Sequence, residues 1–403
     1  MTKSKIVVLH FTYSQVYAGA EEHMVTLLRG LDRKLFRPLL ACHPRLLEEM
    51  RHTLPNDVEV FPIRLDGPTS FRAAWQLARI LKKQRVEILH SHMFHSSLLA
   101  SPIGWVCRVP VIVETPHVAE RWRKGWVKGS FFVDRLISRC VTYHIAVSQS
   151  NALYLEHCKR LHADKVITIR NGCDLAHFAR DRQAPEELCK NLGISDGDLS
   201  LLVPARLEPQ KGHAVLLKAL PQVLREFPKL KAIFVGDGSL RKNLERQSHD
   251  LGLDSSVKFV GYQSRMADWY AMADLMVLPS FYEGLPLVAI ESLASCCPVV
   301  ATAVDGTPEV VVDGETGLTV PPGEPGPLAE AICFMFRNPE MRKSLGLRGR
   351  ELVESEFDQA KQIRETADLY RRGLGFGGQR LNHSISHLQS AAEPAAKALA
   401  ARQ

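Results

Sequence analysis

Two glutamates, Glu283 and Glu291, bracket the stretch of this sequence whose residue types are best suited to binding chemistry. Between them, Gly284 lets the backbone approach a ligand closely, and Pro286 suits the first turn of a helix that we expect over residues 287–295. A helix N-terminus favours a diphosphate, and ionised carboxylates accept hydrogen bonds from sugar and ribose hydroxyls. Taken alone, however, the pattern also fits a strand–loop–helix unit with two solvated glutamates.

Two cations, Arg206 and Lys211, lie in a glycine-containing loop that follows a predicted strand and precedes a helix. At the carboxyl end of a strand such cations can neutralise a leaving diphosphate. Two cations in a loop are, by themselves, more often just solvated. Their meaning therefore depends on the glutamate-containing stretch described above.

Two weaker candidates lie earlier in the chain. Gly19 permits a tight approach in the loop before a helix that begins near Glu21, but the loop lacks the G-x-G-x-x-G pattern, which argues against a nicotinamide dehydrogenase. His117 ends a predicted strand, from where its imidazole could hydrogen-bond a sugar. The chain has 16 histidines, so a structural role for His117 is the main alternative.

These residues must be positioned by an alternation of short β-rich runs with helical segments, which predicts parallel sheets covered by helices. A polar stretch at 176–198 separates two such series and looks like a linker with a small helix. We also expect a helix at 352–372. The residues that follow it show no strand or helix pattern and form a tail. The β-rich runs before and after the linker are 5–11, 37–43, 87–92, 109–117, 143–148 and 166–172, then 199–207, 231–238, 257–262, 274–280 and 298–304.

Composition is that of a globular protein, with 45% hydrophobic and 24% charged residues, and no apolar run is long enough to span a membrane. The chain starts with a short basic lead that enters a strand directly, so we expect a cytoplasmic protein. Nine cysteines without a C-x-x-C pair argue against a disulfide framework or a structural zinc site. Residues 1–190 carry 28 Lys+Arg against 18 Asp+Glu, a net +10, and the remainder carries 23 against 26, a net −3.

The chain resembles the retaining glycosyltransferases of family 4 (glycosyl transferases group 1), and the resemblance spans about residues 5–370. It implies a GT-B α/β fold, in which two Rossmann-like, doubly wound domains face each other across a cleft. The implied division is an acceptor-binding domain (1–180), a linker (181–198), a nucleotide-sugar-binding domain (199–354), a helix crossing back to the first domain (355–372) and a tail (373–403). The matching motifs are YAGAE, ETPH, VSQS, RNGCDLAHF, ARLEPQKG, VGDGSLR, FVGY, ADLMVLPSFYEGLPLVAIESLA, PVVAT and DGTPEVV.

The resemblance implies a role for each matching residue. Glu283 should hold donor-sugar hydroxyls and Glu291 the ribose. The diphosphate should be held by Arg206 and Lys211. Beside the transferred sugar we expect His117, and the other implied binding residues are Gly19 on the phosphate and acceptor side, Tyr262 near the base, and Gly284, Leu285, Pro286 and Leu287 on sugar and phosphate.

Three departures from the family pattern affect these assignments. Many relatives have Gly-Gly where this chain has Gly19-Ala20, and many have His-Asp where Val118 follows His117. Cys173 occupies a position within the NGVD-like motif. The implied roles of Gly19 and His117 therefore rest on weaker matches than those in the second half of the chain.

The implied activity is hexosyl transfer (EC 2.4) from a UDP- or GDP-sugar to a glycan or a lipid-linked, lipopolysaccharide-type acceptor, with retention and without a metal or other cofactor. A D-x-D pair, Asp196 and Asp198, is the metal motif of another glycosyltransferase class. Here it precedes an apolar strand instead of following one. We therefore do not assign it a metal, and the donor base, sugar, linkage and oligomeric state stay undetermined.

Residues 119–132 alternate four cations with two tryptophans and two phenylalanines. Such a segment can lie on an anionic membrane, peripherally at its inner face. The alternative is a basic surface loop whose aromatic side chains face the core.

Other functions are left open by the resemblance. A nucleotide-sugar epimerase of the same fold would need further acid–base groups, and a polymerising synthase usually carries longer insertions. A non-catalytic sugar-binding protein would be expected to lose Glu283, Arg206 or Lys211, all of which are present. A nucleic-acid binder fits only the basic charge, with no matching motif.

Overall fold

The structure is a computed structural model that describes residues 5–64, 70–118, 120, 130–179, 182–195 and 197–376. Most of the basic, aromatic segment at 119–132, Asp196 of the D-x-D pair and nearly all of the expected tail lie outside these residues. Within them, no helix is both long and apolar enough to cross a bilayer. All nine cysteines lie inside the described ranges and are free thiols.

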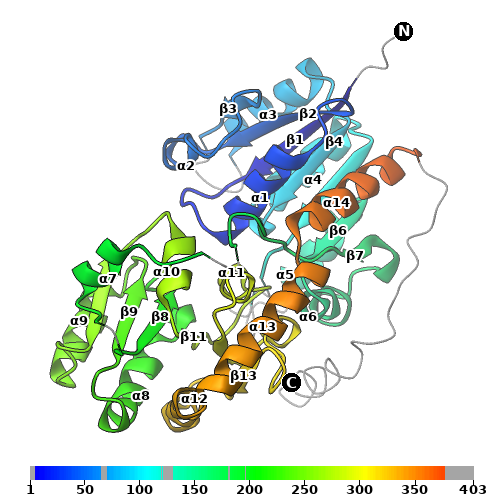
Figure 1. Ribbon diagram of the computed structural model, residues 1–403. Helices are drawn as coiled ribbons and strands as arrows, with labels where there is room; N and C mark the ends of the chain where they lie inside the picture. The colour runs from blue at the N-terminus through cyan, green and yellow to red at the C-terminus, as the bar shows by residue number, and fades with distance from the viewer. Residues whose placement is uncertain are drawn as a thin grey trace. The chain divides into compact units, whose positions relative to one another are not determined.

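The chain forms two compact units, which divide between Asn171 and Gly172 and again between Asp358 and Gln359. Each unit is built on its own parallel sheet covered by helices, so the α/β class and the two doubly wound units predicted from the sequence are confirmed (Figure 1). Two edge strands, β3 and β13, each four residues long, were not predicted.

The first unit holds a seven-stranded sheet of order β3-β2-β1-β4-β5-β6-β7. Most of its inner strands are apolar along nearly their whole length because they are buried on both faces, whereas the strand at 88–92 includes two histidines and a serine. The strands are β1 (Ile6–Thr12), β2 (Phe36–Cys42), β3 (Glu59–Pro62), β4 (Ile88–His92), β5 (Val111–Thr115), β6 (Tyr143–Ala146) and β7 (Val166–Thr168). The helices are α1 (Gly19–Gly30), α2 (Pro44–Met50), α3 (Phe71–Lys83), α4 (Phe94–Val106), α5 (Ser130–Ser138), α6 (Gln149–Leu153) and α14 (Gln359–Gly373).

Helices cover both faces of this sheet. One apolar cluster joins residues of β1, β2, β4 and β5 to α3, α4 and α5, so these three helices form one layer. The clusters that contain α1, α2 and α14 lie on the opposite face, and Figure 1 shows α14 beside α1. Helix α3 shows the local cause: Ser70 caps its start, and Ala73, Leu77 and Leu81 recur at four-residue spacing on its buried side.

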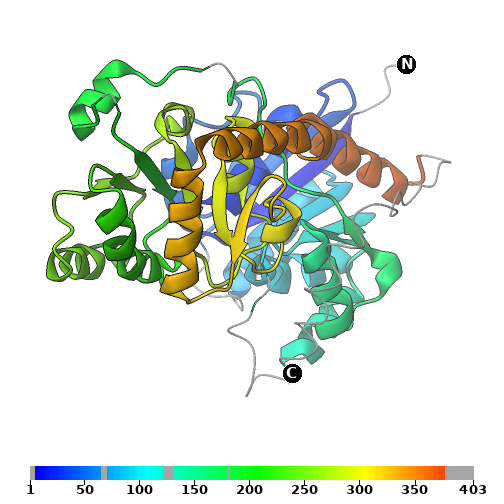
Figure 2. The same cartoon turned by 60° about the horizontal axis from the view of Figure 1, so that its bottom comes forward.

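The second unit holds a six-stranded sheet of order β10-β9-β8-β11-β12-β13. Figure 2 shows α12 and α13, in orange, beside the yellow strands at one edge of this sheet. The strands are β8 (Ser200–Pro204), β9 (Lys231–Val235), β10 (Val257–Gly261), β11 (Leu275–Leu278), β12 (Val299–Thr302) and β13 (Gly317–Val320). The helices are α7 (Glu186–Leu192), α8 (His213–Glu226), α9 (Arg241–Asp250), α10 (Met266–Met272), α11 (Leu287–Ala294), α12 (Pro325–Arg337) and α13 (Pro339–Glu356).

The single helix expected at 352–372 is wrong, because the chain breaks between α13 and α14. Phe357 is buried, and its carbonyl oxygen accepts a hydrogen bond from the amide of Cys173 at 2.9 Å. Asp358 forms an isolated β-bridge with the same residue. These extended contacts are incompatible with helical backbone, so the helix ends at Glu356 and a new one begins at Gln359.

Candidate functional site

In the second unit, the order of the strands reverses between the neighbours β8 and β11. From β8 the next strands in the chain, β9 and β10, extend the sheet toward one edge, and from β11 the strands β12 and β13 extend it toward the other. Ligands of open parallel sheets bind beyond the carboxyl ends of the strands at such a point. The loop after β8 carries Arg206 and Lys211, and the loop after β11 carries Glu283 and Gly284. The two motifs singled out in the sequence thus lie at one switch point.

Backbone and side-chain hydrogen bonds join these two loops. Phe281 donates its amide to the carbonyl of Gln210 at 2.8 Å, and the Gln210 side chain donates to the carbonyl of Tyr282 at 2.8 Å. Gly212 has φ +66°, and a Cβ there would collide with the carbonyl oxygen of Pro279. A glycine is therefore required for the two loops to approach this closely.

This contact brings Lys211 onto Glu283. The Lys211 ammonium donates to Oε1 of Glu283 at 2.6 Å, and the buried hydroxyl of Ser280 donates to the same oxygen at 2.6 Å. The Glu283 side chain is only 6% exposed. Among the described residues no hydrogen bond reaches its second oxygen, Oε2. One carboxylate oxygen is thus fixed by two donors while the other is available to a ligand hydroxyl.

A third loop, after β12, braces the same turn. The amide of Glu283 donates to a carboxylate oxygen of Asp305 at 2.9 Å, and Gly306 donates its amide to the carbonyl of Gly284 at 3.1 Å. Asp305 holds φ +43°, an uncommon conformation for a residue with a side chain. Three strand-end loops therefore determine where the Glu283 carboxylate lies.

Helix α11 begins at Leu287, with Pro286 as its N-cap instead of in its first turn, and it ends at Ala294, one residue earlier than predicted. Within the described chain no side chain caps this N-terminus, so its first amides are available to an anion. Further along the helix, Glu291 accepts a 2.9 Å hydrogen bond from the hydroxyl of Tyr270. Burial, followed by the Glu291 charge, raises the pKa of Tyr270 well above its usual value, so this hydroxyl stays a donor.

Two further predicted residues of this unit are exposed. Arg206 lies two residues beyond the end of β8, and Tyr262, 68% exposed, follows β10 directly. Strands β9 and β8 lie between β10 and β11. At about 4.8 Å per strand, Tyr262 is therefore offset from the Glu283 loop by three strand spacings, roughly 14 Å across the sheet.

The remaining predicted residues, Gly19 and His117, belong to the first unit. Gly19 is the first residue of α1. At the start of this helix the Ala18 amide donates a hydrogen bond to the Glu21 carboxylate at 3.1 Å. His117 lies two residues past β5 and is 7% exposed, packed against His23 and His92. Burial, followed by the proximity of His23, holds the pKa of His117 well below its usual value, so its imidazole is neutral near pH 7.

Several residues that complete these sites were not predicted from the sequence. Ser280 and Asp305, which fix Glu283, lie within two of the matching motifs, but neither was given a role of its own. The buried histidines beside His117 had a detectable signal: His90 and His92 alternate within a strand expected to be buried on both faces, where a polar residue needs an explanation. Their set is completed by His10 on β1 and His23 on α1.

Two family models match the chain. The model described as Glycosyltransferase Family 4 matches residues 17–177, and the model described as Glycosyl transferases group 1 matches residues 185–352. The first match covers most of the first structural unit and runs six residues past Asn171, and the second lies within the second unit. The resemblance to the glycosyltransferases of group 1 and family 4, inferred from the motifs, is therefore confirmed.

Known proteins resemble the chain over most of its length. An uncharacterized glycosyltransferase of Methanocaldococcus jannaschii is 26% identical, covering 80% of this chain and 87% of the relative. A Mycolicibacterium smegmatis relative, the GDP-mannose-dependent alpha-(1-6)-phosphatidylinositol monomannoside mannosyltransferase, is 26% identical, with 84% of each covered. The crystal structure of Anabaena HepE in complex with UDP-glucose matches with a TM-score of 0.80 at 20% identity, covering 91% of this chain and all of that one. The predicted GT-B fold is thus confirmed.

Proposed function

Because the chain belongs to the glycosyltransferases of group 1 and family 4, we propose that it transfers a hexose from a UDP- or GDP-sugar to a lipid-linked or glycan acceptor with retention of configuration. The observation that carries the donor half is the Glu283 carboxylate. It lies at the β8/β11 switch point with Oε1 bound to Lys211 and Ser280 and Oε2 open. An open, oriented carboxylate oxygen is suited to sugar hydroxyls.

Neighbouring groups of the second unit could bind the other parts of the donor, its diphosphate, ribose and base. Arg206, Lys211 and the start of α11 would offset the charge of the departing diphosphate, with Gly284 to Leu287 as the backbone beside it. Glu291 would accept a hydrogen bond from the ribose, and Tyr262 would border the base. This set of charges needs no metal ion to stabilise the leaving group.

In the first unit, His117 would contact the transferred sugar, and Gly19 would line the phosphate and acceptor side. The neutral imidazole of His117 can donate or accept one hydrogen bond. We propose that the acceptor attacks the face of the sugar from which the diphosphate departs, and that the diphosphate takes the acceptor proton. A trapped covalent glycosyl–enzyme adduct would contradict this mechanism.

The acceptor half of the proposal rests on the outer surface of the α3, α4 and α5 layer, which we call the aromatic face. Helix α3 carries four cations and no carboxylate, and aromatic rings lie among these cations on its exposed side. The guanidinium carbon of Arg79 lies 5.5 Å from the centroid of the Trp75 ring. Aromatic and cationic side chains on one face favour the surface of an anionic bilayer. The exposed apolar residues of this face are Phe71, Trp75, Trp105, Val106, Phe132, Val133 and Leu136.

This face supports a lipid-linked acceptor and a peripheral membrane location, because an enzyme held at a bilayer meets acceptors anchored there. Of the basic segment considered from the sequence, Phe132 is described, and it is 64% exposed. The M. smegmatis relative is itself named for a phosphatidylinositol mannoside. The aromatic face is therefore the basis for preferring a lipid-linked acceptor over a free glycan.

A panel of nucleotide sugars tests the donor half. We expect slow release of free nucleoside diphosphate from one donor, and Glu283→Gln to lower that rate roughly 100-fold, as when one group that stabilises a transition state is removed. The variant keeps the shape of the side chain, so circular dichroism should be unchanged. The anomeric configuration of the product, followed by NMR, tests retention.

The matched control is Glu245→Gln, which removes an exposed carboxylate of the same unit that pairs, among the described residues, only with Arg241 on its own helix. It should leave the rate unchanged. A Glu283→Gln variant that releases diphosphate at the wild-type rate would refute the role of Glu283, and an isomerised donor without transfer would favour an epimerase.

A further inference from the structure

Five buried histidines gather in the first unit where β1 and β4, the two strands at its own switch point, lie side by side. They are His10, His23, His90, His92 and His117, and all are 7% exposed or less. His10 pairs in register with His90, and His92 follows two residues later on the same face of the sheet. The proposed function uses only His117, so the other four are unexplained.

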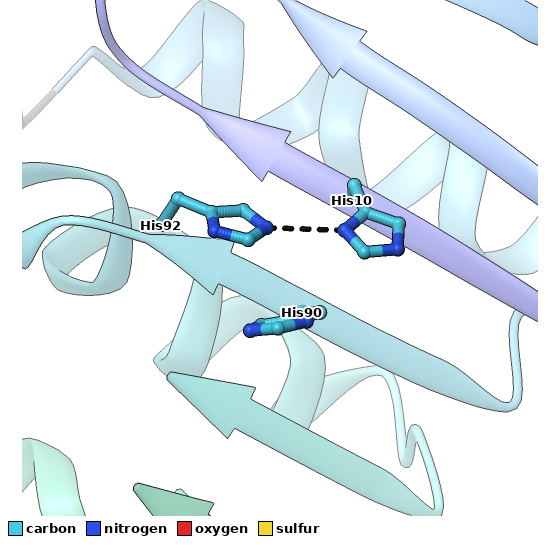
Figure 3. Close-up of side chains that lie close together, drawn as sticks. All are labelled: His10, His90 and His92. Carbon is cyan, nitrogen blue, oxygen red and sulfur yellow. Dashed lines mark hydrogen bonds between the residues drawn. The ribbon is translucent and has the colours of Figure 1, made fainter. Parts of the chain in front are cut away.

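Each of the three strand histidines drawn in Figure 3 has at least one partner, although Nε2 of His10 is buried without a hydrogen-bond partner among the described residues. His10 and His92 face one another, with 3.0 Å between Nδ1 of His10 and Nε2 of His92. Both nitrogens of His90 are bound to hydroxyls, Nδ1 to Tyr370 at 2.5 Å and Nε2 to Thr115 at 2.7 Å. His90 thus has no nitrogen left to share with His10 and His92.

A second group, formed by His23, His92 and His117, is different. Nε2 of His23 is fully buried and has no hydrogen-bond partner among the described residues. Nδ1 of His92 lies 3.4 Å from Nε2 of His117, which is long for a hydrogen bond. One ligand nitrogen from each of the three residues lies within 4.8 Å of the other two.

We propose that His23, His92 and His117 bind a divalent transition-metal ion, zinc being the most suitable, through Nε2, Nδ1 and Nε2 respectively. Zinc–imidazole bonds of about 2.0–2.1 Å at tetrahedral angles separate the ligand nitrogens by about 3.3–3.4 Å. The His92–His117 distance matches that spacing, and a ligand nitrogen of His23 lies within 4.8 Å of those of both other residues. Imidazole is a preferred ligand of such ions.

The opposite nitrogens of the ligands are held as metal ligands usually are. Nδ1 of His23 lies 2.8 Å from Oδ1 of Asn171 and 2.8 Å from Nε2 of Gln362 on α14. Nε2 of His92 is held by His10. Burial lowers the pKa of each of the three ligands below its usual value, so they are neutral and ready to bind a cation near pH 7.

Three protein ligands leave a fourth position for water, as in other three-histidine sites. The site also leaves Nδ1 of His117 free for a sugar hydroxyl. The metal proposed here is therefore separate from the diphosphate-binding groups of the second unit, which are assigned no metal. Its presence does not depend on whether the donor assignment is correct.

Zinc binding by the full chain tests the proposal. After treatment with a chelator and addition of zinc chloride, we expect elemental analysis of the desalted protein to give one zinc per chain. Cobalt(II) should bind in its place with the intense visible absorption of a tetrahedral complex. Less than one tenth of an equivalent of zinc after desalting would overturn the proposal.

Variants locate the site. His23→Gln should weaken zinc binding at least 100-fold, and Gln362→Ala, which removes only a supporting contact, should weaken it about 10- to 100-fold. His249→Gln, at an exposed position on α9, should have no effect. Zinc that is retained by the Gln362 and His23 variants but lost in His90→Gln would place the metal in the other histidine group and refute this assignment. If His23→Gln does not fold, the Gln362 variant decides alone.

Discussion

Glu283 and Lys211 form an ion pair, although they are 72 residues apart in the sequence. The family resemblance implies that Glu283 holds the sugar hydroxyls and Lys211 the diphosphate. Because the ammonium lies 2.6 Å from the carboxylate, a substitution of either residue changes the orientation of its partner. Effects of single and double substitutions at these positions should therefore be strongly non-additive.

The neighbouring positions of Lys211 and Glu283 could be predicted from the sequence, since each follows a strand and the carboxyl ends of parallel strands share one edge of a sheet. The sequence could not predict which oxygen of Glu283 stays open, because that depends on Ser280, Lys211 and the loop carrying Asp305. Such contacts join loops far apart in the chain. They depend on tertiary geometry and leave no local pattern.

Gly212 is the residue on which the approach of the two loops depends. We expect Gly212→Ala to destabilise the second unit by about 2–4 kcal/mol, since the new Cβ meets a backbone carbonyl and φ is positive. Urea unfolding monitored by circular dichroism measures the change. Donor binding should weaken as well, because the Lys211–Glu283 pair is displaced.

Gly314 provides the control for this prediction. It has φ +72°, but a Cβ there meets nothing within 4 Å. Gly314→Ala should therefore cost only the conformational term of about 1–2 kcal/mol and leave donor binding intact. Equal effects of the two substitutions would show that the collision with Pro279 does not determine the stability of the loop pair.

At the scale of elements, local signals account for both ends of α3, because the Ser70 cap, the buried stripe and the terminal lysines all agree. The break between α13 and α14 was missed. Residues 357 and 358 are compatible with a helix locally, and only their pairing with Cys173 makes the chain extended there. Helix boundaries set by tertiary contacts of this kind are the least accessible to sequence analysis.

The aromatic face of α3 gives a prediction at the same scale. The full chain should bind anionic vesicles at low salt and be released at high salt, because both apolar burial and charge contribute. Trp75→Ser should weaken binding roughly 10-fold or more, from the loss of about 1.5–3 kcal/mol of apolar burial. Sedimentation with vesicles of neutral and anionic composition measures this.

A control for the vesicle experiment is Phe334→Ser, on α12 of the second unit, where the ring is 40% exposed. It removes a surface aromatic outside the aromatic face and should leave vesicle binding unchanged. Absence of binding to anionic vesicles at low salt, or equal loss in both variants, would count against the aromatic face as a membrane-binding surface.

For the whole molecule, the histidine cluster makes the first unit sensitive to acid. Burial lowers the pKa of His10 to about 3 and of His23 to about 4, from about 6.5 in the unfolded chain. The unfolded state therefore binds more protons below pH 6.5. The contribution of these two histidines to the free energy of unfolding is complete above that pH. It is lost as the pH falls toward 4 for His23 and toward 3 for His10, by up to about 1.4 kcal/mol per pH unit for each histidine.

Hydrogen exchange of chelator-treated protein at pH 7 and pH 5.5, corrected for intrinsic rates, measures this effect. We expect the opening free energy of peptides from β1 and β4 to fall by several kcal/mol. Peptides of the second unit should change less, because among its described residues His213 is the only buried histidine with a lowered pKa. Equal changes in both units would contradict this account.

Helix α14 imposes an order on the folding of the newly made chain. It supplies Gln362 and Tyr370 to the histidine cluster of a unit whose other strands and helices end by Asn171. At ribosomal rates of about 5–20 residues per second, the roughly 200 residues between them take about 10–40 s to emerge. The first unit to be synthesised is therefore the last to be completed, and a nascent-chain chaperone would meet its unfinished histidine-lined surface while the second unit is already able to fold.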